Sequence, residues 1–319
     1  MDKARIIGMN VTCVIPTYTK FNFLWETIDS VLEQDYPEIE IIITDDASDD
    51  FNEKAIVDYI EQHRKENIKR VKILRHEKNV GTVKNLNSAI SMCNDGLIFP
   101  LASDDKLASK DVISLVVKRF EDTNCKVLAC SRLKCSQDMK QEIRLMPHPG
   151  YLKYIKENMN TAEEQYLNTA LGSGMEFASG ASMYYTKSFF DEVGQYDSRY
   201  LLWEDGPFIA KVTRIGVKIE TAYDIVAIRY RDGGISSKGK KDKVQSKIEV
   251  DYYNMIRNEY LDYPEKFTKR QQRIIRGRYE LLKKPSVNPF KQLWDYPETT
   301  LSMFSIKIRK FLYRYIFNR

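Results

Sequence analysis

Short β-branched runs alternate with amphipathic segments of helical length over the first 135 residues of this 319-residue chain. The five strand-like runs are Val11–Ile15, Ile39–Ile43, Val71–Leu74, Gly96–Pro100 and Cys125–Leu133. Apolar residues recur at helical spacing between these runs, over residues 24–32, 55–63, 84–90 and 112–120. Strands that alternate with such helices usually pair in parallel through right-handed crossovers. The sequence therefore predicts an α/β fold with a mainly parallel central sheet and helices on both faces.

Polar and acidic residues follow the ends of four of these strands. In chain order they are Pro16 and Thr17, Asp45 and Asp46, Asn79 and Gly81, and Asp104 and Asp105. The carboxyl ends of parallel strands line the crevice where open α/β sheets bind ligands. Neighbouring carboxylates repel each other unless a cation or a hydrogen-bond donor binds them. A hard divalent ion that also binds phosphates is one such cation. The alternative is a solvated acidic turn, as at Asp49 and Asp50.

Several other classes of site are disfavoured by missing motifs. The first strand is not followed by G-x-G-x-x-G and the chain has no G-x-x-x-x-G-K-[ST], which speaks against a nicotinamide fingerprint and a P-loop. Five cysteines without C-x-x-C spacing and three scattered histidines speak against a disulfide framework and a histidine-built metal site. Residues 1–10 lack a signal-peptide core and no window resembles a membrane-spanning helix, so we expect a cytoplasmic protein.

Four segments, in unbroken order over about residues 10–236, resemble the motifs of family 2 glycosyltransferases, which have the Rossmann-like GT-A fold. The segments are VIPTYTKFNFLWETIDSVLEQDYPEIEIIITDDASDD, NVGTVKNLNSAI, LASDDKL and GASMYYTKSFFDEVGQYDSRYLLWEDGPFIAKVTRIG. The resemblance implies transfer of a sugar from a nucleotide sugar with inversion at the anomeric carbon. It also implies a GT-A domain over residues 1–237, with a nucleotide-sugar half over about 10–130 and an acceptor half over about 131–237.

The resemblance implies the following nucleotide-sugar site: Pro16, Thr17, Tyr18, Asp46, Asn79, Gly81, Lys84, Ser103, Asp104 and Arg231. Asp46 would accept a hydrogen bond from the uracil imide of a UDP-sugar, whereas Asp45 and Asp49 could simply cap the following turn. Lys84 replaces an arginine of the family, and a solvated helix position is an equal alternative for it. Arg231 belongs to the loop 230–237, which could fold over the diphosphate or could be an ordinary glycine turn.

The resemblance implies a metal at Asp104 and Asp105. Asp104 aligns with the metal-binding aspartate of the family, whereas Asp105 could bind the metal only indirectly or contact the ribose. In the family's acidic motif the first position is an aspartate, whereas this chain has Ala102 there. The cation, Mn²⁺ or Mg²⁺, would therefore have fewer protein ligands, and the diphosphate and water would supply the others.

The resemblance places the catalytic carboxylate in Trp203-Glu204-Asp205. A sugar hydroxyl is too weak an acid to attack unaided, and a carboxylate can take its proton as the new bond forms. Asp205 is the predicted base, with Glu204 orienting the acceptor and Trp203 stacking on an acceptor sugar. The alternatives are that the carboxylates cap a helix and that Trp203 is core. Residues 146–173 carry no interpretable motif, although their position suggests that they shape the acceptor pocket.

The end of the chain is strongly basic, with fourteen Lys or Arg and three Asp or Glu from Lys266 onward, against a net charge of +5 for the whole chain. Residues 238–319 are predicted to form a helical extension. Its last helix carries an apolar face, formed by Leu301, Phe304, Ile308, Phe311, Leu312 and Tyr315, beside the cations Lys307, Arg309, Lys310 and Arg314. This face has two interpretations: it packs on the domain or on a partner helix, or it lies on an anionic membrane through residues 301–319.

The resemblance thus implies an inverting glycosyltransferase of bacterial surface-polysaccharide assembly, such as capsule synthesis. The expected donor is a nucleotide sugar, with UDP as the expected nucleotide, and the expected acceptor is lipid-linked or a glycan. No nucleic-acid partner is expected. The expected location is the cytoplasm, at the inner face of the cell membrane. The rival interpretations are a nucleotidyltransferase, which also uses carboxylates and Mg²⁺, and a non-catalytic scaffold of a synthase complex.

Overall fold

The computed structural model describes residues 8–19, 21–233, 243–283 and 288–316. The chain divides into two compact units. The sheet unit comprises residues 1–144, 180–196 and 220–232, and the helical unit comprises residues 145–179, 197–219 and 233–319. The predicted domain boundary at 237/238 lies outside the described residues and stays a prediction.

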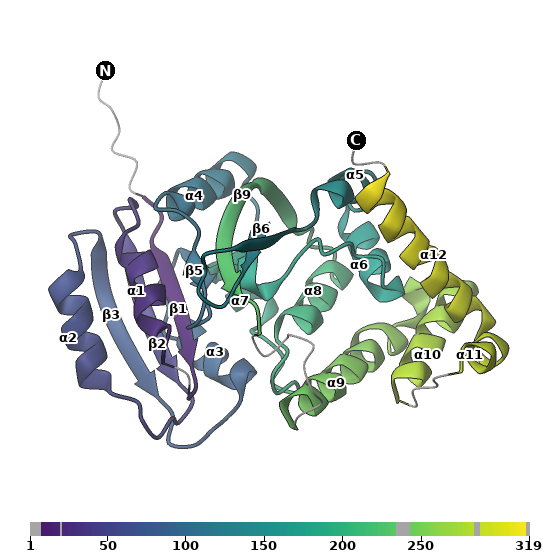
Figure 1. Cartoon of the computed structure of the whole chain (residues 1–319), viewed down its shortest axis with the longest axis horizontal. Coiled ribbons are helices and arrows are strands. Elements are labelled where there is room, and N and C mark those ends of the chain that lie inside the picture. The colour runs from purple at the N-terminus through teal and green to yellow at the C-terminus, as the bar shows by residue number, and fades with distance from the viewer. Residues whose placement is uncertain (1–7, 20, 234–242, 284–287, 317–319) are drawn as a thin grey trace. The chain divides into compact units, whose positions relative to one another are not determined.

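One sheet runs through the sheet unit (Figure 1). Among the described residues it has nine strands, in the order β3-β2-β1-β4-β8-β6-β9-β5 with β7 beside β6. The strands are β1 (Val11–Thr17), β2 (Ile39–Asp45), β3 (Ile68–Arg75), β4 (Leu97–Pro100), β5 (Lys106–Leu107), β6 (Val127–Cys135), β7 (Glu142–Met146), β8 (Met183–Thr186) and β9 (Glu220–Arg231).

The first four strands pair in parallel, as the alternation of strands and helices predicted. The connecting helices are α1 (Leu24–Leu32), α2 (Glu53–His63) and α3 (Thr82–Ile90), followed by α4 (Val112–Thr123) and α7 (Lys187–Val193). Right-handed crossovers put α1 and α2 on one face of the sheet and α3 on the other. Cys13 and Ile41 belong to the same buried cluster as Ile28 of α1, which fixes that helix on the sheet.

Beyond β4 the sheet is mixed. Strand β8 runs antiparallel to both of its neighbours, β4 and β6, whereas β6 and β9 are parallel. Neither β8 nor β9 was predicted from the sequence. Strand β8 has four residues, and Tyr184 and Tyr185 are both fully buried, so it lacks the polar alternation that marks a strand.

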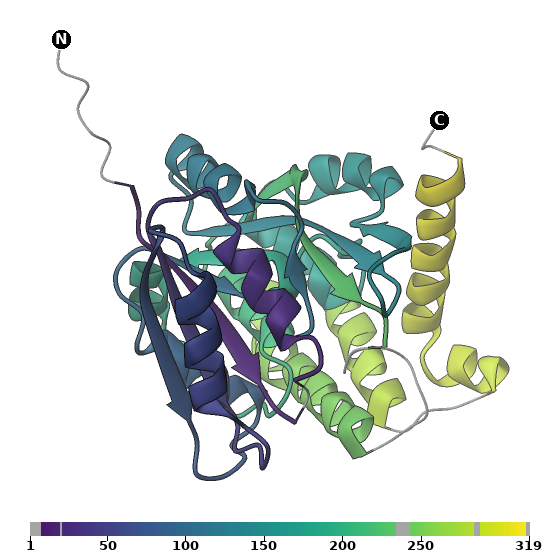
Figure 2. The same cartoon turned by 60° about the vertical axis from the view of Figure 1, so that its left-hand side comes forward.

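The helical unit contains α5 (Pro149–Asn158), α6 (Ala162–Leu171), α8 (Asp205–Arg214), α9 (Lys243–Met255), α10 (Lys269–Lys283), α11 (Pro289–Asp295) and α12 (Pro297–Tyr315). The predicted C-terminal helices are therefore present. Helix α12, yellow in Figure 2, packs on α5, α10 and α11. Among the described residues, no helix combines the length and the hydropathy that crossing a bilayer requires.

Candidate active site

The loop after β2 is built around Asp45, which is fully buried. Its Oδ1 accepts hydrogen bonds from the hydroxyls of Thr17 (3.1 Å) and Ser48 (2.6 Å), and its Oδ2 accepts from the Ser48 amide (2.8 Å). Strand β1 reaches the same point, because Thr17 is the register partner of Asp45. Asp45 therefore holds the turn, which is the structural role that the sequence left open for it.

Asp46 joins two loops at the carboxyl edge of the sheet. Its Oδ1 accepts from the Val80 amide (2.6 Å) and its Oδ2 from the Gly81 amide (2.9 Å). Gly81 begins α3 with a φ of 88°, a conformation that a residue with a Cβ rarely adopts. Asp46 is buried, and each of its oxygens has a lone pair left beyond these bonds. A contact with a nucleobase would have to use those remaining lone pairs.

The other predicted donor-site residues of these loops differ in exposure. Pro16 and Ser103 are half-buried, and Tyr18, Asn79 and Lys84 are exposed. Asn85, beside Lys84, accepts from the Thr44 hydroxyl (2.5 Å) and so fixes α3 to the end of β2. Lys84 is thus carried on a rigid helix with its ammonium in solvent.

Arg231 ends β9 and holds the acidic loop that follows β4. Its Nε donates to the Gln137 carbonyl (2.9 Å), one terminal nitrogen to Glu26 Oε2 (2.8 Å) and the other to the Asp104 carbonyl. Its guanidinium lies 3.8 Å from the centre of the Phe23 ring, and Arg231 is only 3% exposed. All three guanidinium nitrogens therefore have protein partners, and Arg231 fixes the loop that carries Asp104 and Asp105. Its predicted contact with a diphosphate stays a prediction, and residues 234–237 of the predicted lid lie outside the described residues.

The paired carboxylates of this loop have different surroundings. Asp105 is buried and its Oδ1 accepts from the Arg231 amide (3.3 Å), whereas Asp104 is half-buried. Burial and the charge of Asp104 raise the pKa of Asp105 well above its usual range, and Arg231 partly offsets this shift. An added cation would relieve the same repulsion, so the donor set suits a hard divalent ion. Within the described part of the chain, no group of three or more His, Cys, Asp or Glu is arranged to hold a metal.

In the helical unit, Glu204 and Asp205 stand at the start of α8. Asp205 Oδ1 accepts from the Gly206 amide (2.7 Å). Glu204 is half-buried, and its partial loss of solvation together with the neighbouring charge of Asp205 raises its pKa from 4.5 to about 8. The shift favours the protonated form of Glu204, which can donate a hydrogen bond to a hydroxyl. A pair of adjacent carboxylates at the start of a helix is a candidate for binding an acceptor hydroxyl and taking its proton.

The segment that leads into these carboxylates is held by Asp251 of α9. This carboxylate is 3% exposed and accepts from the amides of Leu201 (3.0 Å), Leu202 (2.8 Å) and Trp203 (3.1 Å). Three donors on one carboxylate fix the backbone directly before Glu204. The sequence analysis missed Asp251, because the three amides it binds are about 50 residues away and carry no side-chain signal.

Trp203 is half-buried and covers the beginning of α8. A Cβ added to Gly206 would lie 2.3 Å from the indole of Trp203, so only glycine leaves room for this packing. The indole also packs on Tyr252 of α9, with ring centres 5.1 Å apart. One part of the Trp203 side chain is thus packed, as in a core residue, and the other part is accessible, as stacking on an acceptor sugar would require.

Comparison with known proteins agrees with this fold. The model of the family described as "Glycosyl transferase family 2" matches residues 12–194. Among curated relatives, the abequosyltransferase RfbV of Salmonella typhimurium is 29% identical over 60% of this chain and 57% of its own length. The teichuronic acid biosynthesis glycosyltransferase TuaG of Bacillus subtilis, itself named as putative, is 26% identical over 47% of this chain and 58% of its own length. The chain thus spans a little over half of either relative.

Solved structures share the fold at low sequence identity. S. aureus TarS 1–349 superposes with a TM-score of 0.60 at 16% identity, covering 95% of this chain and 82% of that one. The mannosyltransferase PcManGT from Pyrobaculum calidifontis, solved with GDP-Man and Mn²⁺, gives 0.56 at 15% identity, covering 95% and 76%. The chain has the GT-A fold. It belongs to glycosyl transferase family 2, as its sequence motifs indicated.

Proposed function

We propose that the chain is an inverting glycosyltransferase that moves a sugar from a UDP-sugar to a hydroxyl group of a lipid-linked or polysaccharide acceptor, in bacterial surface-polysaccharide assembly such as capsule synthesis. The observation that carries the proposal is the adjacent carboxylate pair Glu204 and Asp205 at the start of α8, where Asp251 holds the backbone directly before it. The structure of TarS in complex with UDP-GlcNAc, which shares the fold, supports a nucleotide-sugar donor. The name of RfbV, an abequosyltransferase, supports sugar transfer, and the name of TuaG, a teichuronic acid biosynthesis glycosyltransferase, supports a polysaccharide product.

On the donor side, Asp46 and the loop around Gly81 would receive the base, and Pro16, Thr17, Tyr18, Asn79 and Lys84 would complete the pocket. Asp104 and Asp105 would hold Mn²⁺ or Mg²⁺, which when bound neutralises charge on the diphosphate leaving group. Two carboxylates leave several coordination positions for phosphate and water, which these ions accept. Arg231 would act by holding the acidic loop through its bond to the Asp104 carbonyl.

On the acceptor side, Asp205 would take the proton of the attacking hydroxyl while that oxygen bonds to the anomeric carbon. The bond from this carbon to the diphosphate oxygen breaks in the same step, and its electron pair leaves with the nucleotide, so the configuration inverts. Glu204, protonated, would donate a hydrogen bond that orients the acceptor. Trp203 would stack on an acceptor sugar.

A panel of nucleotide sugars with and without Mn²⁺, read by thermal shift and by product analysis, tests this function. We expect a UDP-sugar to raise the melting temperature more with Mn²⁺ than with EDTA, because a ligand that binds only the folded state stabilises it. Transfer should release UDP, and EDTA should abolish it. Release of pyrophosphate would indicate a nucleotidyltransferase instead, and the absence of both transfer and donor hydrolysis would indicate a scaffold.

We also propose that the protein binds the inner face of the cell membrane through an exposed aromatic surface of α11 and α12. Phe290 and Trp294 of α11 are 84% and 87% exposed, and Phe304 and Phe311 of α12 are 62% and 56% exposed. The opposite side of α12 is packed: Thr299 is buried against α10, and Arg309 donates to the Tyr154 hydroxyl (3.0 Å). Helix α12 therefore has a packed side and an open side, and the basic composition of the C-terminal segment favours an anionic bilayer.

The test of this surface should use substitutions, because deleting α12 would also remove packing from α5 and α10. We expect Phe304→Ser/Phe311→Ser to weaken binding to phosphatidylglycerol vesicles at least tenfold in a sedimentation assay, since two rings no longer enter the bilayer. The matched control is Leu115→Ser on α4, an exposed leucine of the sheet unit, which should bind vesicles as the wild type does. Equal vesicle binding by the wild type and the double variant would refute membrane binding through this aromatic surface.

A further inference from the structure

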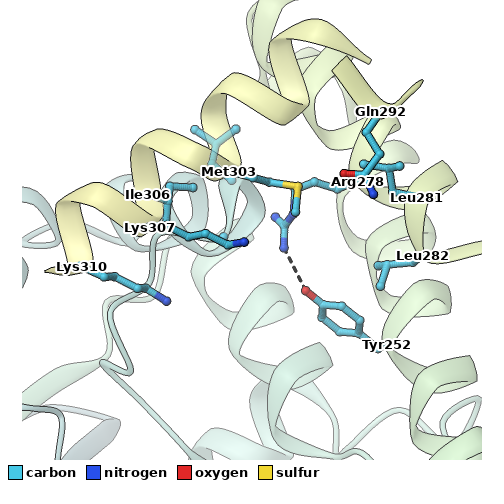
Figure 3. Close-up of a pocket in the computed structure, with 11 residues that line it drawn as sticks. Tyr252, Arg278, Leu281, Leu282, Gln292, Met303, Ile306, Lys307 and Lys310 are labelled. Atoms are coloured by element: carbon cyan, nitrogen blue, oxygen red, sulfur yellow. Dashed lines mark hydrogen bonds between the residues drawn. The ribbon is translucent and has the colours of Figure 1, made fainter. Parts of the chain in front are cut away.

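The helical unit contains a pocket that no part of the proposed mechanism uses. Its volume is about 420 Å³, and it is lined by residues of α9, α10, α11 and α12 together with the end of α6 (Figure 3). The walls are mainly apolar, formed by Leu171, Leu281, Leu282, Met303 and Ile306. Pockets of a few hundred Å³ with apolar walls and few polar groups are typical small-molecule sites.

Three cations belong to this lining, namely Arg278, Lys307 and Lys310, and no aspartate or glutamate does. The Arg278 guanidinium bonds to the Ala170 carbonyl and to the Tyr252 hydroxyl (3.0 Å), neither of which is anionic. Among the described residues, Lys307 and Lys310 form no ion pair. Figure 3 shows both lysines extending from α12 on the side that faces Arg278. Like charges gathered in an apolar pocket favour an anionic ligand, because its charge would relieve their repulsion.

We infer that this pocket binds the lipid carrier of the acceptor, as an apolar chain that bears a phosphate or diphosphate group. The three cations would hold the phosphate, and the apolar walls would hold the first part of the chain. The inference rests on the proposed function, in which the acceptor is lipid-linked. It adds the site and the chemical group by which that acceptor is recognised.

The pocket adjoins the acceptor-side segment within the same unit. Tyr252 lines the pocket, and its ring packs on Trp203, which precedes Glu204. The neighbouring residue on α9, Asp251, holds the amides of residues 201–203. A carrier bound beside Tyr252 is therefore separated by one aromatic pair from the segment that carries the catalytic carboxylates.

Titration of the full chain with farnesyl phosphate, a soluble phosphate-bearing isoprenoid, tests the inference without any sugar transfer. We expect calorimetry to detect binding, and Lys307→Gln/Lys310→Gln to weaken it at least tenfold, since two charge-assisted contacts are lost. The matched control is Lys153→Gln/Lys156→Gln, which removes the same charge from the exposed side of α5 and should bind as the wild type does. In transfer assays with a lipid-linked acceptor, the first variant should raise KM for the acceptor.

Three outcomes would overturn the inference: no binding of farnesyl phosphate, equal weakening in both double variants, or an unchanged affinity in the pocket variant. Binding of short-chain phosphatidylglycerol that is as tight as that of farnesyl phosphate and is weakened equally by Lys307→Gln/Lys310→Gln would also overturn it, because the pocket would then recognise bilayer lipid rather than a carrier. Since binding is measured without a donor, its failure leaves the glycosyltransferase assignment intact. Conversely, absence of sugar transfer by the wild type would refute the proposed function while the binding result still stands.

Discussion

Replacement of Asp205 by Asn should lower the turnover of sugar transfer by about 10² to 10⁴, because a positioned base typically contributes that factor. The amide keeps the size of the side chain and can still accept from the Gly206 amide, as Asp205 Oδ1 does at 2.7 Å. It cannot take the proton of the acceptor hydroxyl. Binding of UDP and metal should be nearly unchanged, because the residues proposed for them belong to the sheet unit and Asp205 to the helical unit. Single-turnover kinetics and UDP titration measure the two effects separately.

Glu204→Gln is the matched control at the adjacent position. Glutamine resembles the protonated form that Glu204 has below its pKa of about 8, so this variant should keep more activity than Asp205→Asn at neutral pH. If Glu204→Gln is the inactive variant and Asp205→Asn transfers normally, the base is Glu204. Loss of UDP binding in Asp205→Asn would show instead that this residue supports the fold or the donor site.

The raised pKa of Glu204 also predicts how the stability and the activity of Glu204→Gln depend on pH. Between pH 4.5 and about 8 the unfolded chain ionises Glu204 while the folded chain keeps it protonated. The residue therefore lowers the stability of the fold as the pH rises through that window. Glutamine cannot ionise, so Glu204→Gln should weaken the decline of the melting temperature with pH, and it should remove an activity loss that begins near pH 8.

The parallel part of the fold could be predicted because it depends on local signals. Buried β-branched runs such as Ile39–Ile43 and the helical spacing between them specify each β-α unit, and the right-handed crossover rule orders the strands. Strand β9 could not be predicted in this way. Its charged residues include Asp224, and it enters the sheet through pairing with β6, whose register shifts near Ser131. Such pairing between distant segments leaves little trace in local sequence.

In the candidate site, too, local motifs could be recognised in the sequence, whereas contacts between distant residues could not. The resemblance of short motifs located the acidic pairs and left a turn-capping role open for Asp45 but not for Asp46, whereas the hydrogen-bond partners that decide these roles could not be predicted. Asp45 binds its own turn and Asp46 binds the next loop, a distinction that depends on the position of Val80 and Gly81. Likewise, Arg231 looked like a mobile loop residue, whereas its partners Glu26 and Gln137 come from distant parts of the chain and hold it in place. Side-chain partners of this kind require the tertiary structure.

Asp251 is another residue whose role only the tertiary structure reveals, and its substitution is expected to lower the rate of sugar transfer strongly. Asp251→Asn retains one oxygen, but its N–H₂ would face either the Leu201 amide, the donor to Oδ1, or the amides of residues 201–203, the donors to Oδ2. The backbone that leads into Glu204 and Asp205 should then shift, and a displacement of about 1 Å can lower a rate about a hundredfold. We expect kcat to fall about tenfold to a hundredfold, with KM for the nucleotide sugar unchanged.

The control for this prediction is Glu249→Gln, an exposed position on the same helix, which should transfer sugar at the wild-type rate. A purely structural role for Asp251 predicts fewer folded molecules with normal kinetics, so turnover is normalised to the folded fraction measured by thermal unfolding. A positioning role predicts a second effect. The pH at which activity falls, near 8 in the wild type, should shift in Asp251→Asn, because the surroundings of Glu204 change with the backbone before it. If turnover per folded molecule and the pH limb both match the wild type, Asp251 stabilises the helical unit without positioning the carboxylates.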